Sequence, residues 1–153
     1  AWKVKKKNSD DDTIYMAKIF SGDAAICKAT FEPEAKAFEH LDHPNCVKCH
    51  KIFGTGKSGD GFVMDLIDGK DLNKAIFLKE MFPEGLTKPQ LLNILCQMAE
   101  AIRYCHCERF MVHRDLHQGN WMITNDHHIT LIDFGIAAIL GKNGISNEFW
   151  VTE

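Results

Sequence analysis

The sequence predicts an α+β fold, in which a small antiparallel sheet with one helix is followed by a mainly helical part. Two observations carry this prediction. Short runs rich in β-branched and aromatic residues, bounded by polar turns, are typical of strands; they are residues 13–20, 47–53, 61–67, 121–123 and 129–132. Two longer segments, 30–41 and 87–105, repeat apolar side chains at the spacing of an amphipathic helix.

The composition is that of an ordinary globular protein. Of the 153 residues, 45% are hydrophobic and 25% are charged, which is enough for one core or two small lobes. The net charge of −3 offers no basic surface for nucleic acid or anionic lipid, and no apolar run is long enough to span a membrane. Six cysteines without a signal peptide predict reduced thiols in an intracellular, cytoplasmic protein. We therefore expect neither a nucleic-acid partner nor a membrane partner.

The chain opens with a predicted hairpin. Residues 1–7 alternate apolar side chains with lysines, as an edge strand does, and a turn at 8–12 leads into the strand at 13–20. Lys18 lies inside that apolar strand, where its charge needs a carboxylate or a phosphate as a partner. The alternative is a lysine whose stem lies along an edge strand while its ammonium group stays in water.

The segment 30–41 is predicted to be the first helix. Thr30 is a candidate N-cap and Pro33 falls in the first turn. The helix should end before His43-Pro44, because proline disfavours a helical residue in front of it. Its apolar face consists of Phe31, Ala35, Phe38 and Leu41.

The segment 46–50, Cys-Val-Lys-Cys-His, has the spacing of a c-type haem attachment sequence. Haem attachment requires export, and nothing in the sequence indicates export. A zinc site that adds Cys105 and Cys107 is a second alternative. The strand-like alternation of the segment favours a third interpretation, in which the cysteines are core thiols.

The glycine-rich segment 54–59 does not match a phosphate-binding loop, because the leading glycine would fall at Lys51. It joins two strand-like runs with no helix after it, and is therefore predicted to be a hairpin turn. Residues 71–82 are predicted to form a short helix that ends near Pro83.

The strongest helix signal lies at 87–105. Thr87 and Gln90 have the spacing of a capping box. The apolar stripe, which we expect to face the core, consists of Leu91, Ile94, Leu95, Met98, Ala101, Ile102 and Cys105.

The most informative stretch follows this helix. His-Arg-Asp-Leu at 113–116 is followed by Asn120, then by the hairpin and by Asp-Phe-Gly at 133–135. This order is predicted to gather Asp115, Asn120 and Asp133 at one edge. Two carboxylates and an amide suit phosphoryl transfer, since one carboxylate can accept a hydroxyl proton while the other two groups hold magnesium.

These two motifs, with the hairpin between them, resemble the catalytic loop and the Asp-Phe-Gly segment of eukaryotic-type protein kinases. The resemblance implies a two-lobed fold. Residues 1–67 would be a partial small lobe that lacks the Gly-rich loop. Residues 68–153 would be a partial large lobe with the catalytic loop, Asp-Phe-Gly and the start of the activation loop. Because the chain does not begin with Met and reaches no Ala-Pro-Glu motif, we expect a fragment of a longer domain.

The resemblance also implies roles for individual residues. Met-Ala-Lys-Ile at 16–19 is similar to the family's Val-Ala-Ile-Lys strand, so Lys18 would hold the α- and β-phosphates of ATP. Glu34 would pair with it, with Glu32 and Glu39 as alternatives. The candidate catalytic residues are Asp115 as the base, Lys18, Glu34, Asn120 and His117. The candidate magnesium ligands are Asn120 and Asp133. The candidate ATP-binding residues are Lys18, Met64, Asp65, Ile67, Met122 and Asp133.

Further implied roles concern the adenine pocket, packing and control. Met64 would guard the back of the pocket, Asp65 to Ile67 would offer backbone groups to the adenine edge, and Met122 would pack beneath the ring. Arg114 suggests control by a phosphorylated residue in the segment that follows, where the candidates are Ser146 and Thr152. A packed column of side chains would consist of Phe38, Cys49, His113 and Phe134.

The implied function is ATP- and magnesium-dependent transfer of the γ-phosphoryl group to Ser or Thr of a protein, because the Ala-Ala-Arg-Asn pattern of tyrosine kinases is absent. His117 departs from the lysine usual in Ser/Thr kinases, and a neutral imidazole would make transfer weaker or pH-dependent. Asp-Leu-His-x-Gly-Asn also resembles the loop of aminoglycoside and choline kinase relatives. Two alternatives remain: a small-molecule phosphotransferase, and a pseudokinase or scaffold that binds nucleotide weakly.

Overall fold

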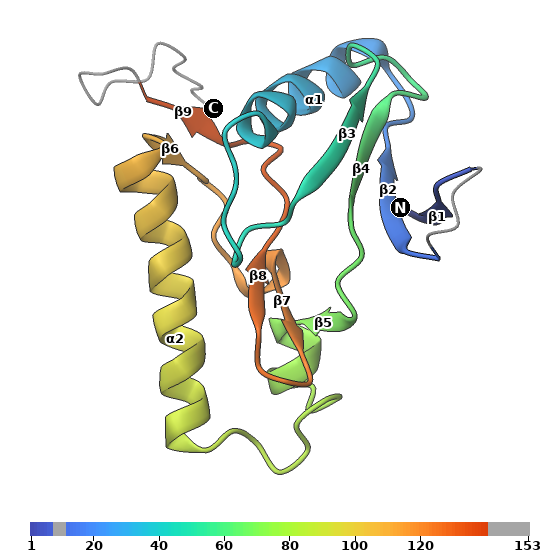
Figure 1. The fold of residues 1–153 in the computed structure, drawn as a ribbon. Helices are drawn as coiled ribbons and strands as arrows, with labels where there is room; N and C mark the ends of the chain where they lie inside the picture. The colour runs from blue at the N-terminus through green and yellow to red at the C-terminus, as the bar shows by residue number, and fades with distance from the viewer. Residues whose placement is uncertain (8–11, 141–153) are drawn as a thin grey trace.

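The computed structural model describes residues 1–7 and 12–140. Within these residues, antiparallel strands form three sheets, and two longer helices lie beside them in a mixed α+β architecture (Figure 1). The strands are β1 (Trp2–Lys5), β2 (Ile14–Ile19), β3 (Cys49–Phe53), β4 (Gly61–Asp65), β5 (Gly69–Asp71), β6 (Met111–Val112), β7 (Trp121–Thr124), β8 (Ile129–Leu131) and β9 (Ala138–Ile139). The helical segments are α1 (Ala24–Phe38), η1 (Asn73–Phe77), α2 (Lys88–Arg103), η2 (Tyr104–Glu108) and η3 (Gln118–Asn120).

The first sheet has the strand order β1-β2-β4-β3, and every neighbouring pair is antiparallel. Lys18 of β2 lies opposite Phe62 of β4, and Met16 lies opposite Met64. Because directly opposite residues share a face of the sheet, these four side chains lie on the same face. The predicted hairpin of the first two strands is confirmed, although most of its turn at 8–12 lies outside the described residues.

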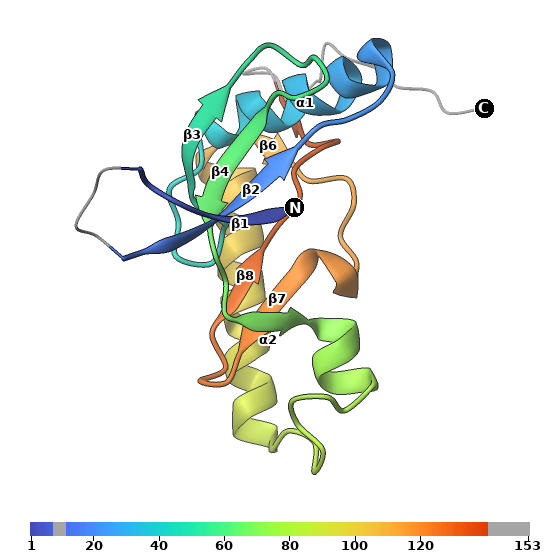
Figure 2. The same cartoon turned by 90° about the vertical axis from the view of Figure 1, so that its right-hand side faces the viewer.

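Helix α1 lies along the first sheet (Figure 2). Aromatic rings form the core between them. Phe62 is fully buried at its centre. The Phe31 ring stacks on it with a centroid distance of 4.8 Å, and the rings of Phe20 and Phe38 meet it edge-on at 5.6 and 5.1 Å. This cluster fixes α1 against the face of the sheet that carries Lys18.

Helix α1 begins and ends earlier than the sequence pattern predicts. Its N-cap is Asp23, whose carboxylate accepts hydrogen bonds from the backbone N–H groups of Ala25 (2.8 Å) and Ile26 (3.2 Å). Thr30 lies inside the helix, where its hydroxyl donates to the carbonyl of Ile26 at 3.1 Å. The predicted range of 30–41 is therefore wrong at both ends. Aspartate is a stronger N-cap than threonine, and the alanine-rich turn that follows Asp23 carries no apolar stripe to mark it.

Helix α2 confirms the predicted capping box. The backbone N–H of Gln90 donates to the Thr87 hydroxyl at 3.4 Å, and the Gln90 side chain accepts from the backbone N–H of Thr87 at 2.8 Å. Ile94 is buried, but Leu91 and Leu95 are 46% and 52% exposed. The expectation that the whole stripe faces the core is therefore wrong, because α2 packs against β8 on one side and leaves these two leucines partly exposed within the described part of the chain.

The rest of the chain is less helical than predicted. The helix expected at 71–82 is reduced to η1, because residues 69–71 pair with β7 in a second sheet of order β5-β7-β8. A Cβ at Gly69 would lie 2.2 Å from the carbonyl oxygen of Ile123, so this close pairing requires glycine. The predicted hairpin of β7 and β8 is confirmed. None of the described helices is long and apolar enough to cross a membrane.

The loop between α1 and β3 attaches the first sheet to the β7–β8 hairpin. The side-chain amide of Asn45, which is buried, donates to the carbonyl of Ile129 at 2.7 Å. Backbone hydrogen bonds from Leu131 to Asn45 (2.8 Å) and from Val47 to Leu131 (2.9 Å) extend the connection. Because β8 is held against this loop, Asp133, which follows β8, has a fixed position relative to the first sheet.

Phe62→Ala is expected to lower the free energy of unfolding by about 3–5 kcal/mol, because it leaves a cavity among three aromatic rings. Urea denaturation of the intact protein, followed by circular dichroism, measures this loss. Lys28→Ala is the control: its side chain is exposed on α1, and its removal should change the free energy by less than about 0.5 kcal/mol. Equal small losses in both variants would contradict the position of Phe62 at the centre of this core.

Candidate active site

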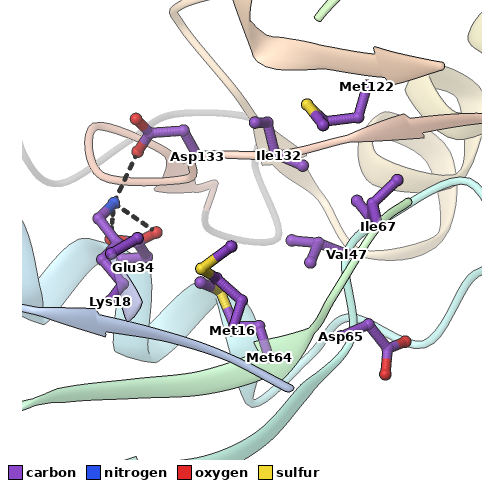
Figure 3. A pocket seen from close by; sticks show the side chains of 11 residues that line it. Met16, Lys18, Glu34, Val47, Met64, Asp65, Ile67, Met122, Ile132 and Asp133 are labelled. Atoms are coloured by element: carbon purple, nitrogen blue, oxygen red, sulfur yellow. Dashed lines mark hydrogen bonds and ion pairs between the residues drawn. The ribbon is translucent and has the colours of Figure 1, made fainter. Parts of the chain in front are cut away.

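A pocket of about 390 Å³ lies between the first sheet and the β7–β8 hairpin (Figure 3). Most of its wall is apolar, and at one end Lys18 approaches the two carboxylates of Glu34 and Asp133. It is lined by Ala1, Met16, Lys18, Glu34, Val47, Met64, Asp65, Ile67, Met122, Ile132 and Asp133. An apolar cleft with a charged end suits a ligand that has a flat hydrophobic part and an anionic part.

Lys18 is the centre of the polar end. Its ammonium nitrogen lies 2.7 and 2.9 Å from the two carboxylate oxygens of Glu34, and 3.0 Å from Oδ1 of Asp133 (Figure 3). Glu34 comes from α1 and is 1% exposed, whereas Glu32 makes a surface ion pair with Lys28 at 3.5 Å. Of the three glutamates considered from the sequence, Glu34 is thus the partner of Lys18.

Burial and pairing act in opposite directions on these charges. Burial lowers the pKa of Lys18, but the carboxylates of Glu34 and Asp133 outweigh it and hold that pKa above its usual value. Burial raises the pKa of Glu34, and the pairing with Lys18 offsets this only in part. Burial also raises the pKa of Asp133, but Lys18 and the backbone N–H of Gly135 outweigh it and bring that pKa below its usual value.

The second group of predicted residues lies in the loop between β6 and β7. The side-chain amide of Asn120 donates to the backbone carbonyl of Asp115 at 2.9 Å and to its Oδ2 at 3.0 Å. The Nε2 atom of His117 lies 3.6 Å from the same oxygen. The backbone carbonyl of Asn120 accepts a hydrogen bond from Ile132 at 2.9 Å, which places this loop beside the residue that precedes Asp133.

His113 links the loop to the Asp-Phe-Gly segment. Burial lowers its pKa and so favours the neutral ring. Nδ1 accepts a hydrogen bond from the backbone N–H of Asp115 (3.3 Å), and Nε2 donates one to the carbonyl of Ile132 (3.1 Å). Its ring meets that of Phe134 at 4.8 Å, and Phe134 meets Phe38 at 6.2 Å. These ring contacts are those expected from the sequence, and Cys49 packs against the same core.

Two residues of these motifs have left-handed backbone conformations. Asp133 has φ 60° and Arg114 has φ 67°, which are unusual for residues with a side chain. The Nε atom of Arg114 donates to the carbonyl of Ile136 at 2.5 Å. Strained backbone of this kind is common where side chains are aimed at a ligand. Ser146 and Thr152, the predicted sites of phosphorylation, lie outside the described residues.

The glycine-rich segment 54–59 is a hairpin turn, as predicted. Gly54 and Gly56 have φ of 87° and 94°, which favours glycine. The carboxylate of Asp60 accepts from the backbone N–H groups of Thr55 (2.7 Å) and Lys57 (2.8 Å). Those N–H groups are therefore engaged within the turn and not directed at a phosphate.

The cysteines of the segment 46–50 are not arranged as a metal site. Cys46 and Cys105 are both buried, and the hydrogen bond between their thiols together with burial raises the pKa of Cys46. Cys107 is exposed, and the described residues contain no group of three or more His, Cys, Asp or Glu placed to hold a metal ion. Cys46 and Cys105 lie in the core, in agreement with the core-thiol interpretation.

The pocket contains residues that sequence reasoning did not assign to the site: Ala1, Met16, Val47 and Ile132. Met16 could have been found, because it lies two residues before Lys18 on a strand and so shares its face. Ile132 directly precedes Asp133. Val47 gives no such signal, because its position depends on the hydrogen bond with Leu131. Asp65 lines the pocket, but its side chain points away from the other labelled residues and pairs with His50 at 2.5 Å (Figure 3).

Asn120 and Asp133 carry oxygen atoms of the kind that bind magnesium. The amide nitrogen of Asn120 is held by Asp115, which leaves its carbonyl oxygen for a ligand. Oδ1 of Asp133 accepts from Lys18, and in the described part of the chain its Oδ2 has no hydrogen-bond partner. Amide and carboxylate oxygens are the ligands that magnesium prefers.

Comparisons with known proteins show which family this chain resembles. A family model described as "Protein kinase domain" matches residues 3–153. Serine/threonine-protein kinase PknF of Mycobacterium tuberculosis is 37% identical over 114 residues, which are 72% of this chain and 23% of that protein. Serine/threonine-protein kinase cds1 of Schizosaccharomyces pombe is 32% identical over 116 residues, 74% of this chain and 24% of that protein. Mitogen-activated protein kinase kinase 9 of Arabidopsis thaliana is 28% identical over 144 residues, 93% of this chain and 43% of that protein. The chain thus spans less than half the length of each of these relatives.

Asp133→Asn is expected to lower stability most near neutral pH. The pKa of Asp133 lies below its usual value, so its ion pair stabilises the folded state above the unfolded-state pKa of about 4 and loses this effect as the pH falls through the folded-state value. The difference in unfolding free energy between wild type and variant should therefore shrink as the pH falls from about 5 to 3. Urea denaturation of the intact protein at a series of pH values measures it.

The matched control for this variant is Asp12→Asn, whose carboxylate is 98% exposed in its pair with Lys5. It should change stability little at any of these pH values, because exposed ion pairs contribute little. A difference between wild type and Asp133→Asn that does not change with pH would contradict the pairing with Lys18.

Proposed function

The chain belongs to the protein kinase domain family, and we propose that it forms the catalytic part of an enzyme that transfers the γ-phosphoryl group of ATP to Ser or Thr hydroxyls of proteins. The observation that carries the proposal is the convergence of Lys18, Glu34 and Asp133 at the polar end of an apolar pocket. Residues 1–67 would then be part of a small lobe and residues 68–153 part of a large lobe.

The pocket suits a nucleotide in size and polarity. Its volume of about 390 Å³ lies in the range of small-molecule sites, and Val47, Met64 and Met122 offer apolar surface to a purine ring. Backbone groups of residues 65–67 would meet the adenine edge. Lys18 would bind the α- and β-phosphates, and the buried carboxylate of Glu34 would hold its ammonium group in place.

Magnesium would be held by the carbonyl oxygen of Asn120 and the carboxylate of Asp133. When bound, the ion supplies positive charge that neutralises the phosphate oxygens. The chain's own contribution is to orient these two ligands. Asn120 is fixed through its amide nitrogen by Asp115, and Asp133 is fixed by Lys18 and by its position after β8.

Asp115 would act as the catalytic base. It orients the acceptor hydroxyl and takes its proton as the hydroxyl oxygen forms a bond to the γ-phosphorus. The bond between that phosphorus and the bridging oxygen breaks, and ADP leaves with the electron pair. The side chain of Asp115 is about half exposed, so an acceptor can approach it from solvent.

Preference for Ser and Thr rests on two observations. The relatives with the highest similarity reported above carry serine/threonine kinase names. The loop after Asp115 reads Leu-His-Gln-Gly-Asn and lacks the Ala-Ala-Arg-Asn pattern of tyrosine kinases. A protein acceptor, as opposed to a small alcohol, is favoured by the match of the family model over residues 3–153.

Asp133→Ala is expected to reduce phosphoryl transfer by at least about 100-fold, because it removes a metal ligand and the charge that holds Lys18. The assay uses γ-labelled ATP and magnesium with the intact protein, and offers a generic Ser/Thr-containing basic protein and a panel of amino alcohols. Asp126→Ala is the control, since Asp126 lies in the β7–β8 turn with Thr124 as its partner, and it should retain activity.

Label in protein Ser or Thr that disappears in Asp133→Ala supports the proposed kinase. Label in the amino alcohols alone would assign the site to small-molecule phosphotransfer. ATP binding without transfer to either acceptor would reject catalysis in favour of a nucleotide-binding scaffold.

A further inference from the structure

His117 occupies the position at which Ser/Thr kinases usually carry a lysine, and its ring lies between Gly119 and Asp115. The backbone N–H of Gly119 donates to Nδ1 of the ring at 3.0 Å. On the other side, Nε2 lies 3.6 Å from Oδ2 of Asp115. We propose that His117 is a positioning residue. The N–H of Gly119 holds its ring, and the ring and the amide of Asn120 together orient Oδ2 of Asp115. Oδ1 is then left to take the proton of the acceptor hydroxyl. This inference rests on the proposed kinase function.

The first contact fixes the tautomer of the ring. A nitrogen that accepts a hydrogen bond from a backbone N–H carries no proton, so in the neutral ring the proton is on Nε2. His117 itself is the N-cap of the short helix η3, with extended backbone at φ −144° and ψ 166°. The ring therefore presents an N–H group on the side of Asp115.

The second feature is the lack of a side chain at position 119. A Cβ on Gly119 would lie 2.8 Å from Cε1 and 3.0 Å from Nδ1 of His117. Apart from residues 118–120 and the nearby backbone of η3, these are the only described atoms within 4 Å of that Cβ position. The φ angle of Gly119 is not in the left-handed region, so its backbone alone does not require glycine. The placement of the His117 ring is what requires it.

Both side-chain contacts to Asp115 involve the same oxygen. Asn120 donates to Oδ2 at 3.0 Å, and the Nε2 of His117 lies near that oxygen, beyond hydrogen-bond distance. In the described part of the chain, Oδ1 of Asp115 has no hydrogen-bond donor. Oδ1 is therefore the carboxylate oxygen that is open to the hydroxyl of an acceptor. Catalytic contacts of this kind shorten when substrate binds.

A lysine at this position would provide a permanent charge on a flexible stem, whereas histidine provides a rigid ring that the Gly119 N–H holds beside Asp115. Histidine in place of lysine thus contributes the orientation of Asp115 where lysine would contribute a positive charge. It also makes Gly119 part of the site, although this glycine is not among the residues that line the pocket.

A double-mutant cycle in the intact protein tests whether Gly119 holds the ring of His117 in place. His117→Ala and Gly119→Ala should each lower kcat for protein phosphorylation about 10-fold or more, with KM for ATP changed less than about twofold, because orientation of the base is lost while the nucleotide pocket stays intact. In the His117→Ala background, Gly119→Ala should change kcat less than about twofold. Gln118→Ala, in the same turn, is the matched control and should behave as wild type.

A second variant separates positioning from simple capping. His117→Asn keeps an oxygen that can accept from the Gly119 N–H, but its side chain is too short to reach Asp115. It should restore the unfolding free energy relative to His117→Ala without restoring kcat. Imidazole ¹⁵N NMR gives a readout that does not depend on activity: the His117 signals should show a proton on Nε2 and none on Nδ1 in wild type, and this pattern should be lost in Gly119→Ala.

Three results would overturn the inference while leaving the kinase function in place. The first is that Gly119→Ala lowers kcat by the same factor in the wild-type and the His117→Ala backgrounds. The second is that His117→Asn recovers the full wild-type kcat. The third is that Nδ1 of His117 carries a proton in the wild-type protein. Absence of any transfer by the wild-type protein would instead reject the proposed function, and this inference with it.

Discussion

The buried carboxylate of Glu34 would destabilise this fold without a cation beside it, and Lys18 supplies that cation. Glu34 is 1% exposed in the middle of α1, beside the aromatic core, and its charge is compensated by an ammonium group 2.7 Å away. The same ammonium group binds Asp133 at 3.0 Å, so one cation joins a strand, a helix and the segment after β8. The two carboxylates that hold Lys18 in the pocket are also those that shift its pKa upward, which keeps it charged for an anionic ligand.

The sequence predicted which side chains meet at this site better than it predicted the framework that carries them. Asp115, Asn120 and Asp133 were found because the spacing of two motifs is a local property of the chain, and Lys18 because a charge inside an apolar strand requires a partner. The start of α1 was missed because Asp23 and Thr30 are both capping residues, and the turn between them has no apolar stripe. The exposure of Leu91 and Leu95 and the pocket position of Val47 could not be predicted, because they depend on which distant segments lie beside them.

The loop from Asp115 to Asn120 illustrates how a departure from a family pattern can be compensated within a few residues. His117 removes a permanent charge, but Gly119 leaves space for the ring and supplies the N–H that holds it. The amide nitrogen of Asn120 donates to the carboxylate of Asp115, which leaves its carbonyl oxygen for another ligand. The contacts within this loop thus hold the side chain of Asp115 from one side.

The central claim is that Lys18 recognises phosphates at the end of an adenine pocket. Calorimetric titration of the intact protein with ATP and with adenosine, for wild type and Lys18→Met, tests it most directly, with unfolding measured alongside because Glu34 loses its cation. We expect the substitution to weaken ATP binding at least about 10-fold and to leave adenosine binding unchanged, since only the phosphates meet the ammonium group. Equal affinities of wild type and Lys18→Met for ATP would contradict the claim.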